Sequence, residues 1–321
     1  MVGTVTVAQP LAGQADAEAE SRAADAAFDG WVRDELAVVE AALDRWVPRD
    51  APAGLGEAMR YGVLDGGKRL RPLLVLAACD AANGDRSAAL RAGVAVELIH
   101  AYSLIHDDMP CMDNDVLRRG KPTVHVKFGE AQAMLAGDAM QALAFEVLTP
   151  GATDAHGYAA LLQARLCGLL ARAAGHEGMA GGQAIDLASI GLPLNEVQLR
   201  DMHRRKTGAL LQASVLMGAA CGELPVKAWD ALTQYGAALG LAFQVVDDIL
   251  DVTQASETLG KTAGKDEHLN KPTYVSVLGL DGARKQAQAL RERAQAALAS
   301  GGLRHTARLS WLADLVVDRN S

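Results

Sequence analysis

Aspartates gathered in two clusters are the residues of this chain best suited to chemistry. The first cluster lies in the segment HDDMPCMDND and consists of Asp107, Asp108, Asp113 and Asp115. The second lies in DDILD, after the apolar run LGLAFQVV, and consists of Asp247, Asp248 and Asp251. Two carboxylates about 4 Å apart repel each other by roughly 4 kcal/mol at an effective dielectric constant of about 20. Acids grouped on apolar helices therefore need positive counter-charge.

Divalent cations supply that charge. Oxygen ligands suit Mg²⁺, which usually keeps several bound waters and is completed by substrate phosphates instead of a closed protein cage. The two clusters together predict a magnesium site that faces a diphosphate. Solvated acids at helix ends are the alternative, and it suits Asp115 better than Asp107 and Asp108. The apolar residues 239–246 argue against it for the second cluster.

Two groups of basic residues are suited to bind such an anion. Lys68, Arg69 and Arg71 follow two glycines in GGKRLRP, and flexible backbone there allows three cations to converge on one anion. Arg118 and Arg119 follow the first aspartate cluster on a predicted loop, and beside four aspartates they are interpreted as anion clamps. For the first group, a solvated basic turn is the alternative.

Other polar residues share a predicted helix face with the first cluster. His100, Ser103 and Asp107 are spaced i, i+3 and i+7, so they lie on one side of a helix. His100 taken alone is more often a hydrogen-bonded core histidine than a ligand. Pro110 disfavours helix at the residue before it, so the helix ends there and a loop must return Asp113 toward Asp107.

The second half of the chain adds further candidates. Lys206 and Thr207 lie in a helix that turns apolar, where a buried ammonium needs an anionic partner. Asp247 and Asp251 are spaced i, i+4 and share a face, and Gln244 lies one turn earlier on nearly the same side. The residues interpreted as permitting close helix packing are Gly181, Gly182, Gln183 and Asp186.

The elements that must position these residues are predicted to be helices. Ala, Leu and Gly are abundant, aromatic residues make up 4% of the chain, and the alternating pattern of strands is scarce. We expect one large all-α domain over residues 28–321, preceded by a flexible Ala-rich tail at 1–27. The predicted helices include 28–46, 91–108, 131–148 and 229–252, and another begins near Asn195.

Charge and cysteine usage exclude several classes of protein. The net charge is −8 and no basic stripe with interleaved aromatics occurs, so a nucleic-acid partner is not expected. Cys79, Cys111, Cys167 and Cys221 are far apart without CxxC spacing, which indicates neither a disulfide framework nor a zinc site. No apolar run approaches the roughly 18 residues that span a bilayer, and no secretory signal pattern occurs. A soluble, cytoplasmic protein is expected.

Taken together, the motifs resemble those of the trans-isoprenyl diphosphate synthase, or polyprenyl synthetase, family, and most closely its bacterial farnesyl diphosphate synthases. GGKRLRP, DDMPCMD followed by LRRGKPT, KTG, FQVVDDILD and LGKTAGKD all occur in family order and spacing. Any one of these motifs is weak evidence, but six in sequence are specific. One departure from the family pattern is Val246, where relatives often have glutamine. Valine cannot make the side-chain hydrogen bonds that a glutamine would make around the site.

The resemblance implies a single helical bundle around a deep central cavity, the isoprenoid synthase fold, and a homodimer. It implies Mg²⁺-assisted condensation of isopentenyl diphosphate with dimethylallyl and geranyl diphosphate, which are the small-molecule partners. The implied metal ligands are Asp107, Asp108, Asp113, Asp247, Asp248 and Asp251. Residues matching the allylic diphosphate site are Arg118, Lys206 and Lys261, and those matching the isopentenyl diphosphate site are Lys68, Arg71, His100 and Arg119. Lys206, Thr207 and Gln244 match the catalytic positions, where oxygen dipoles of the last two face the allylic cation.

Product length is predicted from the helix that carries the first aspartate cluster. Tyr102 lies five residues before Asp107, roughly 7 to 8 Å along the helix axis, and a bulky ring there suits the fifteen-carbon product, farnesyl diphosphate. Ser103 is small, and relatives that make the twenty-carbon product share the inserted Cys111 and Met112, so a geranylgeranyl diphosphate synthase is the alternative. Tyr102 as mere core packing also remains open.

Two other functions are weighed. A class I terpene cyclase shares ionisation triggered by aspartate-bound metal, but it has no use for a second diphosphate site such as Lys68 and Arg71. An inactive partner subunit would be indicated by degenerate aspartate motifs, and both motifs are intact here.

Overall fold

Helices form nearly all of the described chain. The computed structural model describes the backbone of residues 12–64, 66–151, 160–253 and 273–319, and side chains from residue 24 onward within these ranges. In chain order the α-helices are α1 (Ala12–Trp46), α2 (Leu55–Val63), α3 (Leu70–Ala81), α4 (Arg86–Asp107), α5 (Val124–Phe128), α6 (Glu130–Val147), α7 (Ala160–Ala174), α8 (Met179–Ala188), α9 (Glu196–His203), α10 (Ala209–Ala220), α11 (Val226–Thr253), α14 (Tyr274–Ser300) and α15 (Ala307–Val317). The 3-10 turn η1 (Pro52–Gly54) precedes α2, and the π-helical turn η2 (Arg204–Gly208) joins α9 to α10. The predicted all-α fold is therefore confirmed.

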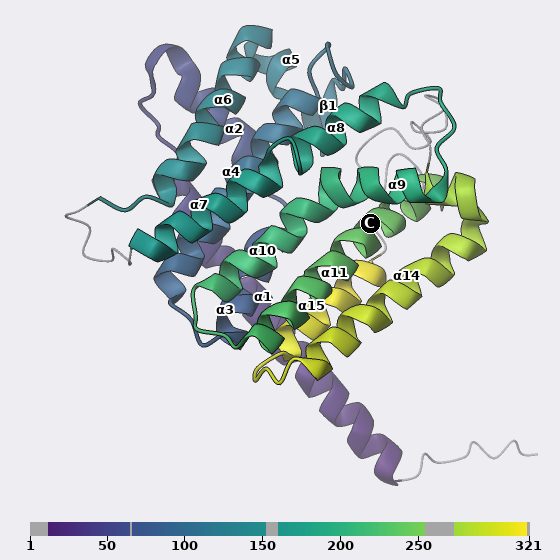
Figure 1. Cartoon of the computed structure of the whole chain (residues 1–321). Coiled ribbons are helices and arrows are strands. Elements are labelled where there is room, and N and C mark those ends of the chain that lie inside the picture. Colours follow the sequence, from purple (N-terminus) through teal and green to yellow (C-terminus); the bar gives the residue numbers. More distant parts are fainter. Residues whose placement is uncertain (1–11, 65, 152–159, 254–272, 320–321) are drawn as a thin grey trace, which may run out of the picture.

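The core consists of two apolar clusters that meet at α3 and α10. One cluster packs α4 against α2, α6 and α7, and the other packs α11 against α14 and α15. Helices α3 and α10 give side chains to both clusters, so they lie between the two halves (Figure 1). Both helices are apolar around nearly their whole circumference, as expected of helices buried on every side.

Close contact between α3 and α10 depends on a glycine. A Cβ atom at Gly218 would lie 2.0 Å from the carbonyl oxygen of Val75, so only glycine fits at this crossing. Because of this glycine, the backbones of α3 and α10 can lie in contact where the two core clusters meet.

Helix ends follow local capping rules at several positions. The side chain of Asp85 accepts hydrogen bonds from the backbone N–H groups of Ser87 and Ala88 at the start of α4. Asn195 and Gln198 form a capping box at the start of α9, which confirms the predicted helix start near Asn195. Helix α4 ends at Asp107, ahead of Pro110, as predicted.

Helix α1 is longer than the sequence prediction. It begins at Ala12 instead of near residue 28, so the Ala-rich stretch expected to be a tail is helical over 12–27. Alanine has the highest intrinsic helix propensity, which favours helix in this Ala-rich stretch. The remaining residues of the expected tail, 1–11, lie outside the described residues.

Helix α4 passes a length-and-composition test for a membrane span, the one such helix among the described residues. Yet 67% of its most apolar window is buried inside the protein. The helix also ends at Asp107 beside the acidic cluster. It is therefore a core helix that carries the site.

Candidate active site

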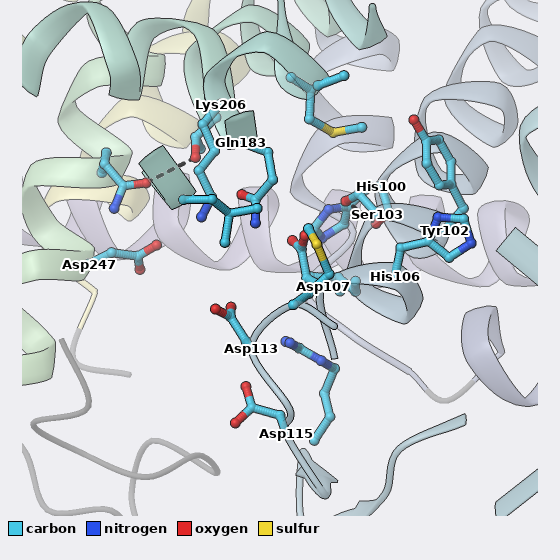
Figure 2. Close-up of a pocket in the computed structure, with 18 of the residues that line it drawn as sticks. His100, Tyr102, Ser103, His106, Asp107, Asp113, Asp115, Gln183, Lys206 and Asp247 are labelled. Atoms are coloured by element: carbon cyan, nitrogen blue, oxygen red, sulfur yellow. Dashed lines mark hydrogen bonds between the residues drawn. The ribbon is translucent and has the colours of Figure 1, made fainter. Parts of the chain in front are cut away.

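A cavity of about 670 Å³ collects the predicted site residues from distant parts of the chain (Figure 2). Its walls come from α3, α4, the loop after α4, α8, η2 and α11. The predicted residues that line it are Arg71, His100, Tyr102, Ser103, Asp107, Asp113, Arg118, Arg119, Lys206, Thr207, Gln244, Asp247, Asp248 and Asp251. Both aspartate motifs therefore border one space, as the sequence predicted.

The loop after α4 folds back onto the end of that helix. The backbone N–H of Asp113 donates to the carbonyl oxygen of Asp107 at 2.9 Å, and that of Asp115 donates to Asp108 at 3.1 Å. These two bonds bring the second half of the motif beside the first, which is the predicted detour after Pro110. Burial raises the pKa of Asp107 to about 6, with Lys206 acting against this rise and the Asp113 charge adding to it. A cation bound beside Asp107 would favour the charged form of this carboxyl.

The second aspartate motif lies on α11, across the cavity from Asp107 (Figure 2). Asp247 accepts a hydrogen bond from Arg319 at 2.7 Å. The buried Asp248 instead accepts from the side-chain amide of Gln244 at 3.1 Å and from the backbone N–H of Tyr274 at 2.7 Å. Asp251 is also buried and lines the same cavity.

Asp108, like Asp248, accepts hydrogen bonds from groups of the protein. The guanidinium of Arg118 makes a two-pronged contact with the Asp108 carboxylate, at 2.6 Å from Nη2 and 2.8 Å from Nε. Arg118 itself belongs to the hairpin of β1 (Leu117–Arg118) and β2 (Lys121–Pro122), whose turn holds Arg119 at a φ of 52°. The role of Asp108 and Asp248 as metal ligands, and of Arg118 as a diphosphate ligand, stays a prediction.

Three carboxylates that line the cavity fit Mg²⁺. Asp107, Asp113 and Asp247 offer only oxygen donors and enter the cavity from opposite walls. Among the described residues, no three His, Cys, Asp or Glu side chains are close enough to hold one ion by themselves. This arrangement suits an ion that is completed by phosphate oxygens and water, which is the usual coordination of Mg²⁺.

The π-helical turn η2 presents Lys206 and Thr207 to the cavity. Lys206 donates to the buried Asp186 at 2.6 Å, which confirms that its ammonium needs an anionic partner. Thr207 donates its hydroxyl hydrogen to the side-chain oxygen of Gln244 at 2.9 Å. Gly182 on α8 allows this turn to approach, because a Cβ atom there would lie 2.1 Å from the backbone nitrogen of Lys206. The extra residue of a π-turn shifts the side chains that follow, and such turns are frequent at functional sites.

The basic segment at the start of α3 divides between the cavity and the core. Arg71 is buried and lines the cavity, and burial lowers the pKa of its guanidinium. Lys68 is exposed, and its pKa is lowered by partial burial and by the nearby Arg319. Arg69 pairs instead with Glu40 and Glu97, each at 2.7 Å. The expectation that all three cations converge on one anion is therefore wrong for Arg69. Its buried guanidinium forms ion pairs with carboxylates of α1 and α4.

The remaining isopentenyl-site candidates lie close to that segment. Arg119 donates to the carbonyl oxygen of Gly66, and its guanidinium packs against Gly67. His100 faces the cavity, and burial first, then Arg71 and Arg118, lower the pKa of its ring well below 6.5. His100 is thus a neutral hydrogen-bonding group at pH 7. Lys261 lies outside the described residues.

The family of the chain follows from a sequence comparison. The polyprenyl synthetase family model matches residues 52–302, which is more than half of the chain. This protein belongs to the polyprenyl synthetase family. It is a trans-prenyltransferase by family, and its cavity, carrying both aspartate motifs, is the candidate active site.

Individual relatives differ in product and share the fold. The large subunit 1 of the chloroplastic heterodimeric geranylgeranyl pyrophosphate synthase of Arabidopsis thaliana is 48% identical over 271 residues, covering 84% of this chain and 73% of that protein. The crystal structure of an FPP/GFPP synthase from Zymomonas mobilis superposes with a TM-score of 0.80 and 42% identity, covering 91% of this chain and 99% of that one. A Helicobacter pylori geranyltransferase, solved with magnesium and isoprenyl diphosphate, has a TM-score of 0.77 and 34% identity, covering 90% and 96%.

Three residues of the prenyltransferase site were missed by the sequence analysis. Gln183 and Asp186 were interpreted as packing residues. Gln183 borders the cavity, and Asp186 accepts a hydrogen bond from Lys206. Their i, i+3 spacing in an otherwise apolar helix was the available signal. Arg319 donates to Asp247 and to the carbonyl oxygen of Phe243, and no local pattern relates it to residues more than 70 positions away.

Proposed function

We propose that this prenyltransferase condenses isopentenyl diphosphate with dimethylallyl and geranyl diphosphate to give farnesyl diphosphate. The observation that carries the proposal is that both aspartate motifs border one cavity together with Lys206 and Arg71. Opposed acids and cations around one space suit a reaction in which a diphosphate leaves. The magnesium and isoprenyl diphosphate bound by the Helicobacter pylori relative support the same assignment.

The first chemical step breaks the bond between carbon 1 of the allylic substrate and its diphosphate oxygen. The electron pair leaves with the diphosphate, so negative charge grows on its oxygens. Mg²⁺, which Asp107, Asp113 and Asp247 would hold, supplies positive charge there when bound. Lys206 is positioned by Asp186 to place its ammonium at the same oxygens. Stabilisation of this growing charge lowers the barrier to ionisation.

The second step joins the two substrates. The alkene of isopentenyl diphosphate attacks the allylic cation, and a proton is then lost to the departed diphosphate. Gln244 is held by Thr207 and Asp248 with its amide beside the cavity, where its dipole faces the cation. Arg71, Arg119 and the neutral His100 line the side where the second diphosphate would bind. A cavity that excludes water protects the cation from quenching.

Tyr102 supports the fifteen-carbon product. Its half-buried ring lines the cavity, and Figure 2 shows it on the far side of Asp107 from Asp247. The ring contacts that of His106 edge-on at a centroid distance of 5.7 Å, so it lies beside the last turns of the helix that bears Asp107. A chain that grows away from the diphosphates meets this ring. Ser103 also lines the cavity and donates its hydroxyl hydrogen to the carbonyl oxygen of His100 at 2.8 Å.

Geranylgeranyl diphosphate is the second candidate product. The name of the Arabidopsis relative, at 48% identity, favours twenty carbons over fifteen. Chromatography of the dephosphorylated product from purified protein, supplied with Mg²⁺, isopentenyl and dimethylallyl diphosphate, separates the two. Farnesol as the main product is expected, and geranylgeraniol would overturn the assignment.

A substitution at Tyr102 tests the physical reason. Tyr102→Ala removes the ring and is expected to shift the main product to twenty carbons or more, because the growing chain then extends past α4. Val226→Ala, on an exposed side chain at the start of α11 and outside the cavity lining, is the matched control and should leave product length unchanged. An unchanged product from Tyr102→Ala would exclude the ring as the floor of the cavity.

We also propose a cytoplasmic homodimer, as the family resemblance implies. Large apolar side chains are exposed on the consecutive helices α5, α6 and α7, among them Val126, Leu135 and Leu161. Light scattering should give twice the chain mass of 33.6 kDa. Leu135→Glu is expected to yield the monomer, whereas Val226→Glu, on α11, should remain dimeric. A wild-type monomer would contradict the proposal.

A further inference from the structure

Gln183 on α8 carries a buried amide that nothing in the fold explains. Both its side-chain nitrogen and its side-chain oxygen are inaccessible to solvent, and no described residue hydrogen-bonds either atom. Buried amide groups nearly always have partners, and leaving them unpaired costs free energy. A leucine or methionine would fill the same volume without that cost. The amide is accounted for when a ligand supplies the missing partner.

The position of Gln183 identifies where that ligand lies. Helix α8 gives the cavity one face, formed by Met179, Ala180, Gln183, Ala184 and Leu187. Gln183 alone in this set is polar. Figure 2 shows its side chain extending into the space that Lys206 and Asp107 also enter. The amide therefore meets the reacting end of the substrate and not its hydrocarbon chain.

The other glutamine of the cavity provides a contrast. Gln244 accepts from Thr207 through its oxygen and donates to Asp248 through its nitrogen, so the protein satisfies its amide. Gln183 has neither contact. Its neighbour Lys206 is already paired with Asp186, one helical turn along α8. Among the described residues, Gln183 lines the cavity beside Lys206 with an amide that has no hydrogen-bond partner in the protein.

From this juxtaposition we propose that Gln183 is a further substrate-binding residue, whose amide N–H donates to an oxygen of the allylic diphosphate beside Lys206. When the carbon–oxygen bond breaks and the electron pair moves onto the diphosphate, this hydrogen bond strengthens because its acceptor gains charge. Gln183 then acts on the same charge as Lys206, from the adjoining helix. The inference rests on the proposed prenyl transfer.

Substitution of the amide at constant volume tests the proposal. Gln183→Met is expected to lower kcat with geranyl and isopentenyl diphosphate by about 100-fold, the usual loss of one such donor. Calorimetry with Mg²⁺ and inorganic pyrophosphate should show binding weakened about tenfold or more. The melting temperature should not fall, because the amide has no partner in the protein to lose.

A second variant separates donor from acceptor. Gln183→Glu keeps an oxygen acceptor, loses the N–H donor and adds negative charge, so it is expected to reduce kcat at least as much as Gln183→Met. Wild-type kcat in Gln183→Glu would overturn the donor assignment. The matched control is Gln132→Met, since Gln132 also has a buried unpaired oxygen but lies away from the cavity, with its nitrogen bound to Ala53. Its kcat should equal that of the wild type.

Assay of the wild-type protein separates failure of the proposed prenyl transfer from failure of the role proposed for Gln183. If it does not consume geranyl diphosphate with isopentenyl diphosphate and Mg²⁺, the proposed function fails. If the wild type turns over and Gln183→Met matches it in both kcat and pyrophosphate binding, the role of Gln183 alone is refuted.

Discussion

At the scale of single residues, the sequence predicts the acids of the site better than their counter-charges. Asp107, Asp113 and Asp247 meet at one cavity because their spacing and apolar flanks already required a shared cation. Arg69 could not be assigned from its motif, since its direction depends on Glu40 from α1 and Glu97 from α4. Asp186 was missed for the same reason, because its partner lies 20 residues further along the chain. The spacing of residues within one helix does not predict ion pairs between different helices.

His203 makes the stability of this prenyltransferase pH dependent. Its ring is buried against Tyr274, and burial lowers its pKa from 6.5 to about 3. Below pH 6.5 this histidine binds a proton in the unfolded chain. In the folded chain it binds one only below about pH 3. Stability is therefore fully present above pH 6.5 and falls as the pH drops, by about 2 kcal/mol at pH 5.

Replacement of that ring checks the sign. His203→Phe keeps the stacking and removes the titrating group, so its free energy of unfolding should decline less than that of the wild type between pH 7.5 and pH 5. Urea unfolding at the two pH values measures the difference. An equal decline in both proteins would show that the ring is not held neutral.

At the scale of elements, helix existence and several ends were predictable, whereas helix shape was not. The capping residues of α9 and the proline after α4 mark their ends locally. The π-turn at Arg204–Gly208 was not predicted from the sequence, and its close approach to Gly182 joins residues that are far apart in the chain. The early start of α1 at Ala12 shows the converse, since alanine propensity favours helix in a stretch that the sequence analysis expected to be a flexible tail.

Close contact between α3 and α10 gives a prediction at this scale. Gly218→Ala would place a Cβ atom 2.0 Å from the carbonyl oxygen of Val75, and backbone cannot move aside easily. We expect the free energy of unfolding to fall by about 2 kcal/mol. Gly30→Ala is the matched control on α1, where the new Cβ meets only Arg33 at 3.9 Å and helix propensity should raise stability by about 0.5 to 1 kcal/mol. A Gly218→Ala protein as stable as the wild type would refute the tight crossing.

At the scale of the whole molecule, the cavity results from two half-bundles that each carry one aspartate motif. Helix α4 brings the first motif from one core cluster, and α11 brings the second from the other. Composition and periodicity predicted the helices, whereas the meeting of the two motifs was predicted from their need for a shared cation and from the family resemblance, and the fold confirms it. The shape of the cavity floor at Tyr102, and hence product length, depends on side-chain packing that the sequence alone does not fix.

The most direct test of the account is the rate at which geranyl diphosphate is consumed with isopentenyl diphosphate and Mg²⁺ by the wild type, Asp107→Asn and Asp247→Asn. Both variants keep side-chain volume and remove the charge that would hold the metal on opposite walls of the cavity. We predict losses of about 100-fold or more in each, with unchanged helicity, while the exposed Asp281→Asn matches the wild type. Near-normal rates in either site variant would contradict a metal held between the two motifs.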